Sequence, residues 1–467
     1  MPLSAFMPLS AFIALCSLLH AVLAVYNVGD QEVLSTTASD RNVASTSSML
    51  RRYQIESKEE RESLLEAAYL VDADIWQVAS DHVDVHIPQS HDHFLSTLDS
   101  VGLSYNDSFI PSSLLELPSK VSSSLLPWSL ISLTNSTFHE DYHPFSEVER
   151  FMDELVELHP NLVSRRNIGH SSEGREMHAL TISRPRANSA KTSDATKKAG
   201  FVITGAQHAR EWIATSTAMY LTHALVSNTS EPYSLSALLN HFDFHIVLVP
   251  NPDGYLYTWE SDRLWYKNRQ VLGPLEKCVG IDMNRNWGYK WKPKARFPLV
   301  AERKKKTKKP SSPTDPCAPW YPGHRPFESP EVNNIANWIT TLPNLRAYVD
   351  LRSYGQMLST PFSYSCKKAP KDAEDQVEAA MGAARAIKAV HGTAFTTGRL
   401  CEMLYRAPGN IVDYMFASAG IKYAYAAHLR DTGTYGFSLP PEWIRPVGEE
   451  TVSMIKSLAG FLSARKY

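Results

Sequence analysis

The chain has few cysteines and almost no net charge. Its 467 residues include 5 cysteines, and the formal net charge at pH 7 is −2. A balanced charge gives no general electrostatic reason to expect nucleic-acid binding. Outside the extreme N-terminus the sequence lacks an apolar run of about 18 residues, so we predict no internal membrane span. The 43% hydrophobic and 21% charged residues are an ordinary globular balance with ample material for a core.

The N-terminal stretch, residues 1–24, is apolar, lacks a clear basic segment and leads into the small residues of "AVLAV". This pattern is typical of a cleaved secretory signal. A membrane anchor is the alternative, but the stretch is short and contains Pro, Ser and His. We therefore predict a secreted or vacuolar protein. Three sequons for N-glycosylation agree with that compartment, at Asn106, Asn135 and Asn228.

Removing the signal removes Cys16 and leaves an even number of cysteines in a secretory context. Pairing neighbouring segments predicts the disulfides Cys278–Cys317 and Cys366–Cys401. Four unpaired core thiols are the alternative.

The pattern along the chain indicates several parts. Residues 25–52 are rich in Ser and Thr and are expected to be a flexible lead-in. Residues 53–105 predict a small α+β module of two strands and two helices, which suits a ferredoxin-like unit. In it, "HVDVHIP" alternates as a half-buried strand does. Residues 106–140 are rich in Ser, Leu and Pro and suit a connecting segment.

The remainder, residues 141–467, predicts an α/β domain with a mixed central sheet flanked by helices, because near-continuous apolar runs alternate with helical patterns. Its first helix, "SEVERFMDELVELHP", opens with Ser146 and Glu149, a capping-box pair. The expected apolar face of this helix consists of Phe151, Met152, Leu155 and Leu158.

One basic segment, residues 297–315, interrupts this regular pattern. A solvated surface insertion is the plainest interpretation. A patch for anionic polysaccharide or a membrane surface is the functional alternative, and a faulty gene model is the third.

The stretch "GAQHAREWIATST" contains a His-x-x-Glu pair, His208 and Glu211, which is half of a typical zinc site. It is followed, in order, by "NPDGY", "DRLWYKNR", "GIDMNRNW", "RSYGQMLSTPFSY", "YRAPGNIVDY" and "LRDTGTYGF". In this combination the chain closely resembles the carboxypeptidase A/B-like zinc metallocarboxypeptidases, also called funnelins. The module at 53–105 resembles their N-terminal pro-domain, which makes the chain zymogen-like. The resemblance implies one zinc ion as cofactor, held by His208, Glu211 and a third histidine.

Three positions depart from that family. The third zinc ligand is replaced by Arg352, whose guanidinium has no lone pair to donate to a metal. The general-base glutamate is replaced by His428, and the arginine that stabilises the oxyanion is replaced by Tyr266. A neutral imidazole and a phenol do not supply the charges that the family's chemistry needs. No catalytic set is therefore intact.

The resemblance also implies residues that contact a peptide substrate: Arg210, Asn284, Arg285, Ser353, Tyr354 and Tyr405. The selector of the substrate side chain falls near Val412, so we expect an apolar preference. For the altered metal site two arrangements are physically open. Either His428 substitutes as third ligand and zinc stays, or the Arg352 guanidinium takes the metal's place and pairs with Glu211, which we favour because zinc beside a permanent cation is repelled.

We therefore interpret the chain as a catalytically inactive metallocarboxypeptidase homologue. It most resembles the fungal inactive group associated with cell-wall organisation, and peptide C-termini are its expected partners. We expect a monomer. One alternative is an active but rewired zinc carboxypeptidase that releases apolar C-terminal residues, and the other is a glycan- or peptide-binding protein of the cell wall.

Overall fold

A computed structural model describes residues 48–88, 92–117, 128–185, 198–292 and 315–465. The predicted signal peptide, most of the lead-in and the basic segment up to residue 314 lie outside the described residues. Within the described part, no helix combines the length and the apolar character that a membrane crossing needs.

The N-terminal module is a four-stranded antiparallel sheet in the order β2-β3-β1-β4, which is the ferredoxin-like arrangement. Its elements are β1 Ser48–Gln54, α2 Lys58–Leu70, β2 Asp74–Val78, β3 His82–Ile87, α3 Asp92–Asp99 and β4 Tyr105–Ile110. The sequence predicted two strands, and the structure adds β2 and β4. Helix α2 begins at a full capping box formed by Ser57 and Glu60.

Strand β3 corrects one sequence-based expectation. Its alternation predicted a half-buried strand, yet Val83 through Ile87 are all buried. Val83 and Val85 pack into the module core. Asp84, on the other face, is fully buried and bonds Tyr354 of the large domain. The polar residues of β3 therefore lie on a face that contacts a polar residue of the large domain, not solvent.

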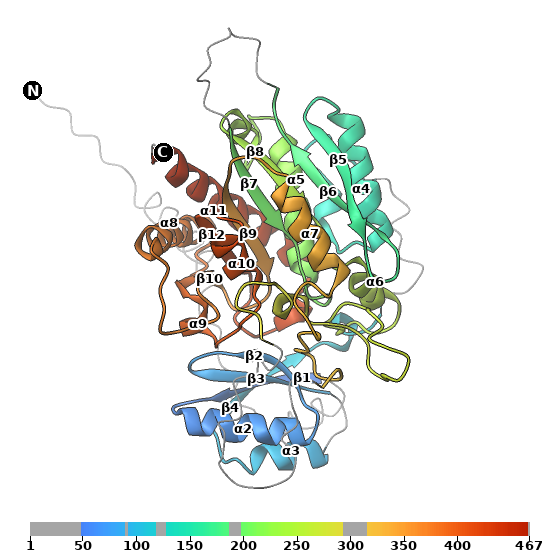
Figure 1. Ribbon diagram of the computed structural model, residues 1–467, viewed down its shortest axis with the longest axis vertical. Helices are drawn as coiled ribbons and strands as arrows, with labels where there is room; N and C mark the ends of the chain where they lie inside the picture. Colours follow the sequence, from blue (N-terminus) through green and yellow to red (C-terminus); the bar gives the residue numbers. More distant parts are fainter. Residues whose placement is uncertain (1–47, 89–91, 118–127, 186–197, 293–314, 466–467) are drawn as a thin grey trace, which may run out of the picture. The chain divides into compact units, whose positions relative to one another are not determined.

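The large domain contains an eight-stranded mixed sheet in the order β11-β10-β12-β9-β7-β8-β6-β5 (Figure 1). Its strands are β5 Val163–His170, β6 Glu176–Ile182, β7 Ala199–Thr204, β8 Phe242–Val247, β9 Leu345–Arg352, β10 Met357–Thr360, β11 Thr396–Arg399 and β12 Tyr423–His428. The central strands β12, β9, β7 and β8 are parallel neighbours.

Helices cover both faces of this sheet (Figure 1). The α-helices are α4 Phe145–Leu158, α5 Trp212–Val226, α6 Pro252–Glu260, α7 Pro330–Thr340, α8 Ala373–His391, α9 Leu400–Met403, α10 Ile411–Ala417 and α11 Ile444–Ala464. On one face α4, α5, α8 and α11 share a core with Phe201 and Ile203 of β7. On the other, α7 and α10 share a core with Val202. Successive side chains of one strand thus enter opposite cores, and the predicted fold class is confirmed.

The first helix of this domain corrects another expectation. Helix α4 begins at Phe145 with Pro144 as its N-cap and without a side-chain cap bond. Ser146 therefore lies inside the first turn, and the predicted capping box with Glu149 is wrong. Leu158 is 42% exposed, and the buried face consists of Val148, Phe151, Met152 and Leu155.

Two disulfides brace the large domain, and both predicted pairings, Cys278–Cys317 and Cys366–Cys401, are confirmed. They join segments 39 and 35 residues apart along the chain. Asn106, Asn135 and Asn228, the asparagines of the three sequons, are all exposed, as attachment of carbohydrate requires.

Candidate functional site

The carboxyl ends of three parallel strands bring two of the altered residues together with the two family ligands that remain. His208 and Glu211 lie between the end of β7 and the start of α5. Arg352 ends β9 and His428 ends β12, and these two residues are directly paired in register. Parallel strands expose their carboxyl ends at one edge of a sheet, which is where α/β folds form their sites. All four residues are buried.

The Arg352 guanidinium lies against both family ligands that remain. Its Nε and Nη2 donate to the two carboxylate oxygens of Glu211, each at 3.0 Å. Its Nη2 is also 2.5 Å from Nδ1 of His208. Burial alone would raise the pKa of Glu211, but Arg352 and His208 hold that pKa well below its usual range. Glu211 is therefore a carboxylate that is satisfied by a guanidinium.

The imidazole of His208 lies between two carboxylates. Nε2 is 3.0 Å from Oδ1 of Asp282, and Nδ1 is 2.8 Å from Oε1 of Glu211. Nδ1 also lies against Nη2 of Arg352, and the same Nη2 donates to Glu211. The Arg352 guanidinium and the His208 ring therefore share the carboxylate of Glu211.

Two further carboxylates complete this buried network, and the sequence interpretation did not single them out. Asp282 supports His208, and Asp350 lies 3.5 Å from Nη1 of Arg352. Asp350 also accepts from Gln207 at 3.0 Å, and burial raises its pKa to about 6. Asp282 stands inside the motif "GIDMNRNW" and could have been noted there. The result is a buried cation surrounded by acids.

These residues do not fit a zinc ion. A zinc site needs lone pairs from three protein ligands and an open position. Here His208 Nδ1 and both Glu211 oxygens are already within hydrogen-bond distance of Arg352, which has no lone pair to offer a metal. Within the described ranges, no group of three or more His, Cys, Asp or Glu side chains is placed to hold a metal.

His428, the candidate substitute ligand, is a buried neutral residue beside Arg352. Burial, together with the neighbouring Arg352, lowers its pKa to about 3, so the ring is neutral at physiological pH. Its Nδ1 is buried and has no hydrogen-bond partner among the described residues. Arg352 contacts Glu211 as the second of the two arrangements considered from the sequence requires.

Tyr266 occupies the position of the family's oxyanion arginine, and its ring stacks on the imidazole of His208. Its ring centroid is 3.7 Å from that of His208, and the guanidinium carbon of Arg210 lies 5.0 Å from the Tyr266 ring. Burial raises the pKa of Tyr266 well above its usual value, so the phenol is neutral. It contributes packing and no formal charge.

The expected carboxylate-binding residues remain close together. Arg285 is buried and donates from Nη2 to the hydroxyl of Tyr405 at 2.6 Å. The Asn284 side chain accepts from the backbone of Ile411 at 3.0 Å, which positions its amide. Val412, the expected selector, is 1% exposed and packs in the apolar core of α10.

Two other expected substrate contacts are bonded to the N-terminal module instead. Nη1 of Arg210 lies 3.0 and 2.8 Å from the two carboxylate oxygens of Asp74. The hydroxyl of Tyr354 donates to Asp84 at 2.6 Å. Ser353 uses its backbone N–H to support Glu211 at 3.1 Å. The module therefore already bonds two of the residues that were expected to contact a substrate, Arg210 and Tyr354. No sequence signal links these distant pairs.

Strand β2 of the module forms one wall of the cleft. A cavity of about 90 Å³ is lined by residues from β2 and by Arg210, Arg285, Arg352 and His428. The ring of Trp76 packs 5.0 Å from that of Phe437. A Cβ at Gly436, where φ is +58°, would lie 2.6 Å from Trp76, so glycine is required there for backbone and space alike.

The Tyr354–Asp84 bond gives a stability prediction. Replacing Tyr354 with phenylalanine removes one of three hydrogen bonds to a buried carboxylate, and we expect a loss of about 1.5–3 kcal/mol in the free energy of unfolding. The matched control is Tyr425→Phe, which removes a bond to the neutral carbonyl of Gln376 and should cost about 0.5–1.5 kcal/mol. Equal losses in urea titrations would contradict a charged acceptor at Asp84.

Comparison with known proteins agrees with this site. A family model described as zinc carboxypeptidase matches residues 148–454. The inactive metallocarboxypeptidase ECM14 of Ajellomyces dermatitidis is 33% identical over 447 residues, which span 88% of this chain and 71% of that protein. A protein of the same name from Paracoccidioides brasiliensis is 33% identical over 448 residues, with 88% and 72% covered.

Solved structures show the same architecture. Thrombin-activatable fibrinolysis inhibitor has a TM-score of 0.76 and 26% identity, with 90% of this chain and 99% of that chain covered. Carboxypeptidase A of Helicoverpa armigera, with a TM-score of 0.72 and 24% identity over 90% and 98%, shares the fold. The family is zinc-dependent, whereas the site here is closed by a guanidinium. The chain belongs to the zinc carboxypeptidase family and is, within it, an inactive-metallocarboxypeptidase-like protein.

Proposed function

We propose that this protein is a metal-free binding protein that recognises peptide C-termini and does not hydrolyse them. The observation that carries the proposal is the contact of the Arg352 guanidinium with both oxygens of Glu211 and with Nδ1 of His208. The three atoms of His208 and Glu211 that a zinc ion would need are thereby already in contact with Arg352.

The rest of the site also lacks the groups for hydrolysis. His428 is neutral and stands where the family has a carboxylate base, and Tyr266 stands where it has a cationic oxyanion donor. Loss of one such donor typically reduces the rate by about 10²–10³. We therefore expect no release of amino acid from a blocked dipeptide at enzymatic rates, roughly 1–10³ s⁻¹. Turnover in that range would support the rewired-enzyme alternative.

Recognition of a carboxylate is supported by Arg285 and Tyr405. An arginine–carboxylate pair is strong and directional, and Arg285 is buried beside Tyr405, where a ligand would be desolvated. The cavity of about 90 Å³ is small compared with ligand pockets, which are typically about 300–1,000 Å³. A peptide therefore needs β2 to move from the cleft wall before its last residue can enter.

The binding test compares a peptide that ends in leucine with its C-terminally amidated twin, titrated calorimetrically into the full chain. We expect the free acid to bind more tightly. Arg285→Met should abolish that preference, a loss of about 2–5 kcal/mol. The control is Arg165→Met. Arg165 lies on the edge strand β5, pairs with Asp153 and does not line the cavity. Equal binding of acid and amide would contradict recognition of the carboxylate.

We also propose a secreted or vacuolar location and a role in cell-wall organisation. Two disulfides and three exposed sequon asparagines support passage through an oxidising, glycosylating compartment. The wall role follows from the resemblance to the fungal inactive group. A decrease in the mass of the native protein after glycosidase treatment tests the proposed location. Altered resistance of a deletion strain to wall-digesting enzymes tests the proposed role in the cell wall.

A further inference from the structure

The disulfide Cys366–Cys401 differs in the exposure of its two ends. Cys366 is exposed, in the turn that follows β10, whereas Cys401 is 4% exposed, in α9. A thiolate attacks a disulfide sulfur that it can reach along the sulfur–sulfur axis. The Cys366 end of the bond is therefore the end nearer to solvent.

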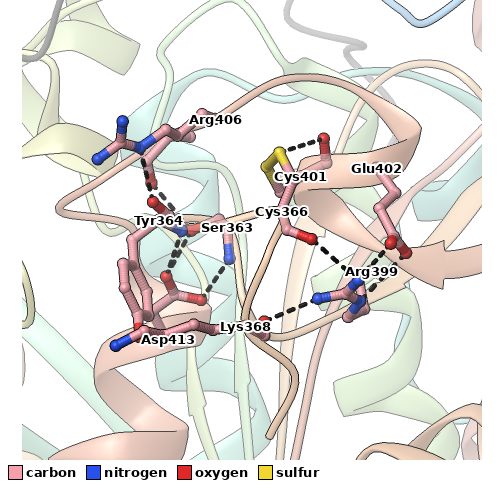
Figure 2. Close-up of a disulfide and its surroundings, with 10 residues drawn as sticks. Ser363, Tyr364, Cys366, Lys368, Arg399, Cys401, Glu402, Arg406 and Asp413 are labelled. Atoms are coloured by element: carbon pink, nitrogen blue, oxygen red, sulfur yellow. Dashed lines mark hydrogen bonds and ion pairs between the residues drawn. A yellow bond between two sulfur atoms is a disulfide. The ribbon is translucent and has the colours of Figure 1, made fainter.

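Basic residues flank the exposed residue Cys366. Lys367 and Lys368 follow Cys366 directly and are exposed, and Arg399 lies across from them with its Nη1 donating to the carbonyl of Lys368 at 2.7 Å. Glu402 pairs with Arg399. Figure 2 shows Arg399 between the backbone carbonyls of the 366–368 turn and Glu402. Cationic surroundings favour the thiolate form of cysteine and attract anionic thiols.

The same disulfide anchors one end of residues 401–407, which are called the Tyr405 segment below. Cys401 is four residues before Tyr405. On the other side, Ala407 N–H donates to Ser363 and Arg406 Nε donates to Tyr364, at 2.9 and 2.8 Å. Both ends of the segment are therefore tied to residues 363–366, one by a covalent bond and one by hydrogen bonds (Figure 2).

The turn itself keeps other supports if the disulfide opens. Asp413 accepts from both the N–H and the hydroxyl of Ser363 at 2.8 Å and from the N–H of Tyr364 at 2.8 Å. Opening the bond therefore removes the covalent tie between α9 and the turn without dismantling the turn, and leaves the bonds of Arg399 to the carbonyls of Cys366 and Lys368.

We propose that Cys366 is a site of reversible thiol–disulfide exchange that loosens the Tyr405 segment. A thiolate from a small anionic thiol forms a new bond to Sγ of Cys366, the Cys366–Cys401 bond breaks, and Cys401 leaves with the electron pair and takes a proton from solvent. The product is a mixed disulfide on Cys366 and a free thiol on Cys401. The consequence for peptide binding rests on the proposed function, whereas the exchange itself does not.

The first test treats the full-length protein with reduced glutathione, traps free thiols with N-ethylmaleimide and maps the products by mass spectrometry. We expect glutathione on Cys366 and maleimide on Cys401. Glutathione on Cys401, or absence of any adduct under conditions where the urea-unfolded chain reacts, would overturn the proposal.

Charge is tested by Lys367→Glu with Lys368→Glu. At low salt this variant should react with anionic glutathione about three- to tenfold more slowly and with cationic cysteamine faster. A change of the same sign for both thiols would contradict electrostatic attraction at Cys366.

Coupling to Tyr405 is tested by hydrogen exchange of the Cys366→Ser, Cys401→Ser variant. We expect the amides of residues 400–405 to exchange at least about tenfold faster while those of β9 are unchanged. Unchanged exchange at 400–405 would overturn the coupling. Faster exchange with unaltered peptide affinity would instead count against peptide recognition by Tyr405, so the two proposals fail separately.

Discussion

Arg352→Met should lower the free energy of unfolding by about 3–5 kcal/mol at neutral pH, because it leaves a buried carboxylate without its partner. In the native protein Glu211 is 1% exposed and receives two hydrogen bonds from Arg352. The measurement is urea unfolding of the parent and the variant. A variant within about 0.5 kcal/mol of the parent, the usual range of surface substitutions, would show that Arg352 is not the partner on which Glu211 depends.

The pH dependence of this effect has a definite sign. In the parent the folded-state pKa of Glu211 is lowered from 4.5, so its stabilising contribution is present above that value and is lost as pH falls through the folded pKa. In the variant, burial without Arg352 raises the pKa of Glu211, and protonation of Glu211 on acidification relieves the site. The stability difference between the two proteins should therefore shrink as pH falls from 7 toward 4.5.

The matched control for this prediction is the double variant Arg352→Met with Glu211→Gln. It replaces the charged pair by two neutral side chains of similar size, and such replacements of buried pairs are often close to neutral. Most of the lost stability should return. A double variant as unstable as Arg352→Met alone would indicate that packing of the arginine, and not its charge, is what the core requires.

Zinc binding should change from undetectable in the parent to a dissociation constant below about 1 μM in Arg352→His. The introduced imidazole starts from the last residue of β9, beside His208 Nδ1 and the Glu211 oxygens that Arg352 now engages. It removes the cation and adds the third ligand at once. Calorimetric titration measures the affinity, and a zinc-dependent rise in melting temperature checks that the folded state binds.

Two controls make this result decisive. Adding His208→Ala to Arg352→His should abolish the new binding, since one of three ligands is lost. The opposite arrangement also has a signature: near-stoichiometric zinc binding by the parent that disappears in His428→Ala would show that His428 substitutes as ligand and that the closed site is wrong. Further replacement of His428 and Tyr266 by Glu and Arg tests whether hydrolysis returns.

Much of the fold could be predicted from local patterns. Apolar runs such as "AGFVITGAQ" and "LRAYVDLRSYG" became β7 and β9 because strands buried on both faces must be apolar throughout. Strands β2 and β4 were missed, because "DIWQV" and "YNDSFI" mix polar and apolar residues without clear alternation. Helix α4 was placed correctly, but its cap was not, because Pro144 ends the preceding segment and sets the start of the helix.

The sequence by itself determined which chemical groups stand at the site. Arg352, His428 and Tyr266 are identified by residue type and by their place in ordered motifs, and residue type alone decides that a guanidinium cannot ligate a metal. Tertiary structure decided which groups touch. Arg352 meets Glu211 across 141 residues, Arg210 meets Asp74 across 136 and Tyr354 meets Asp84 across 270. Hydrogen bonds depend on distances of a few ångströms and on direction, and for partners this far apart along the chain those quantities exist only once the sheet and the module have packed.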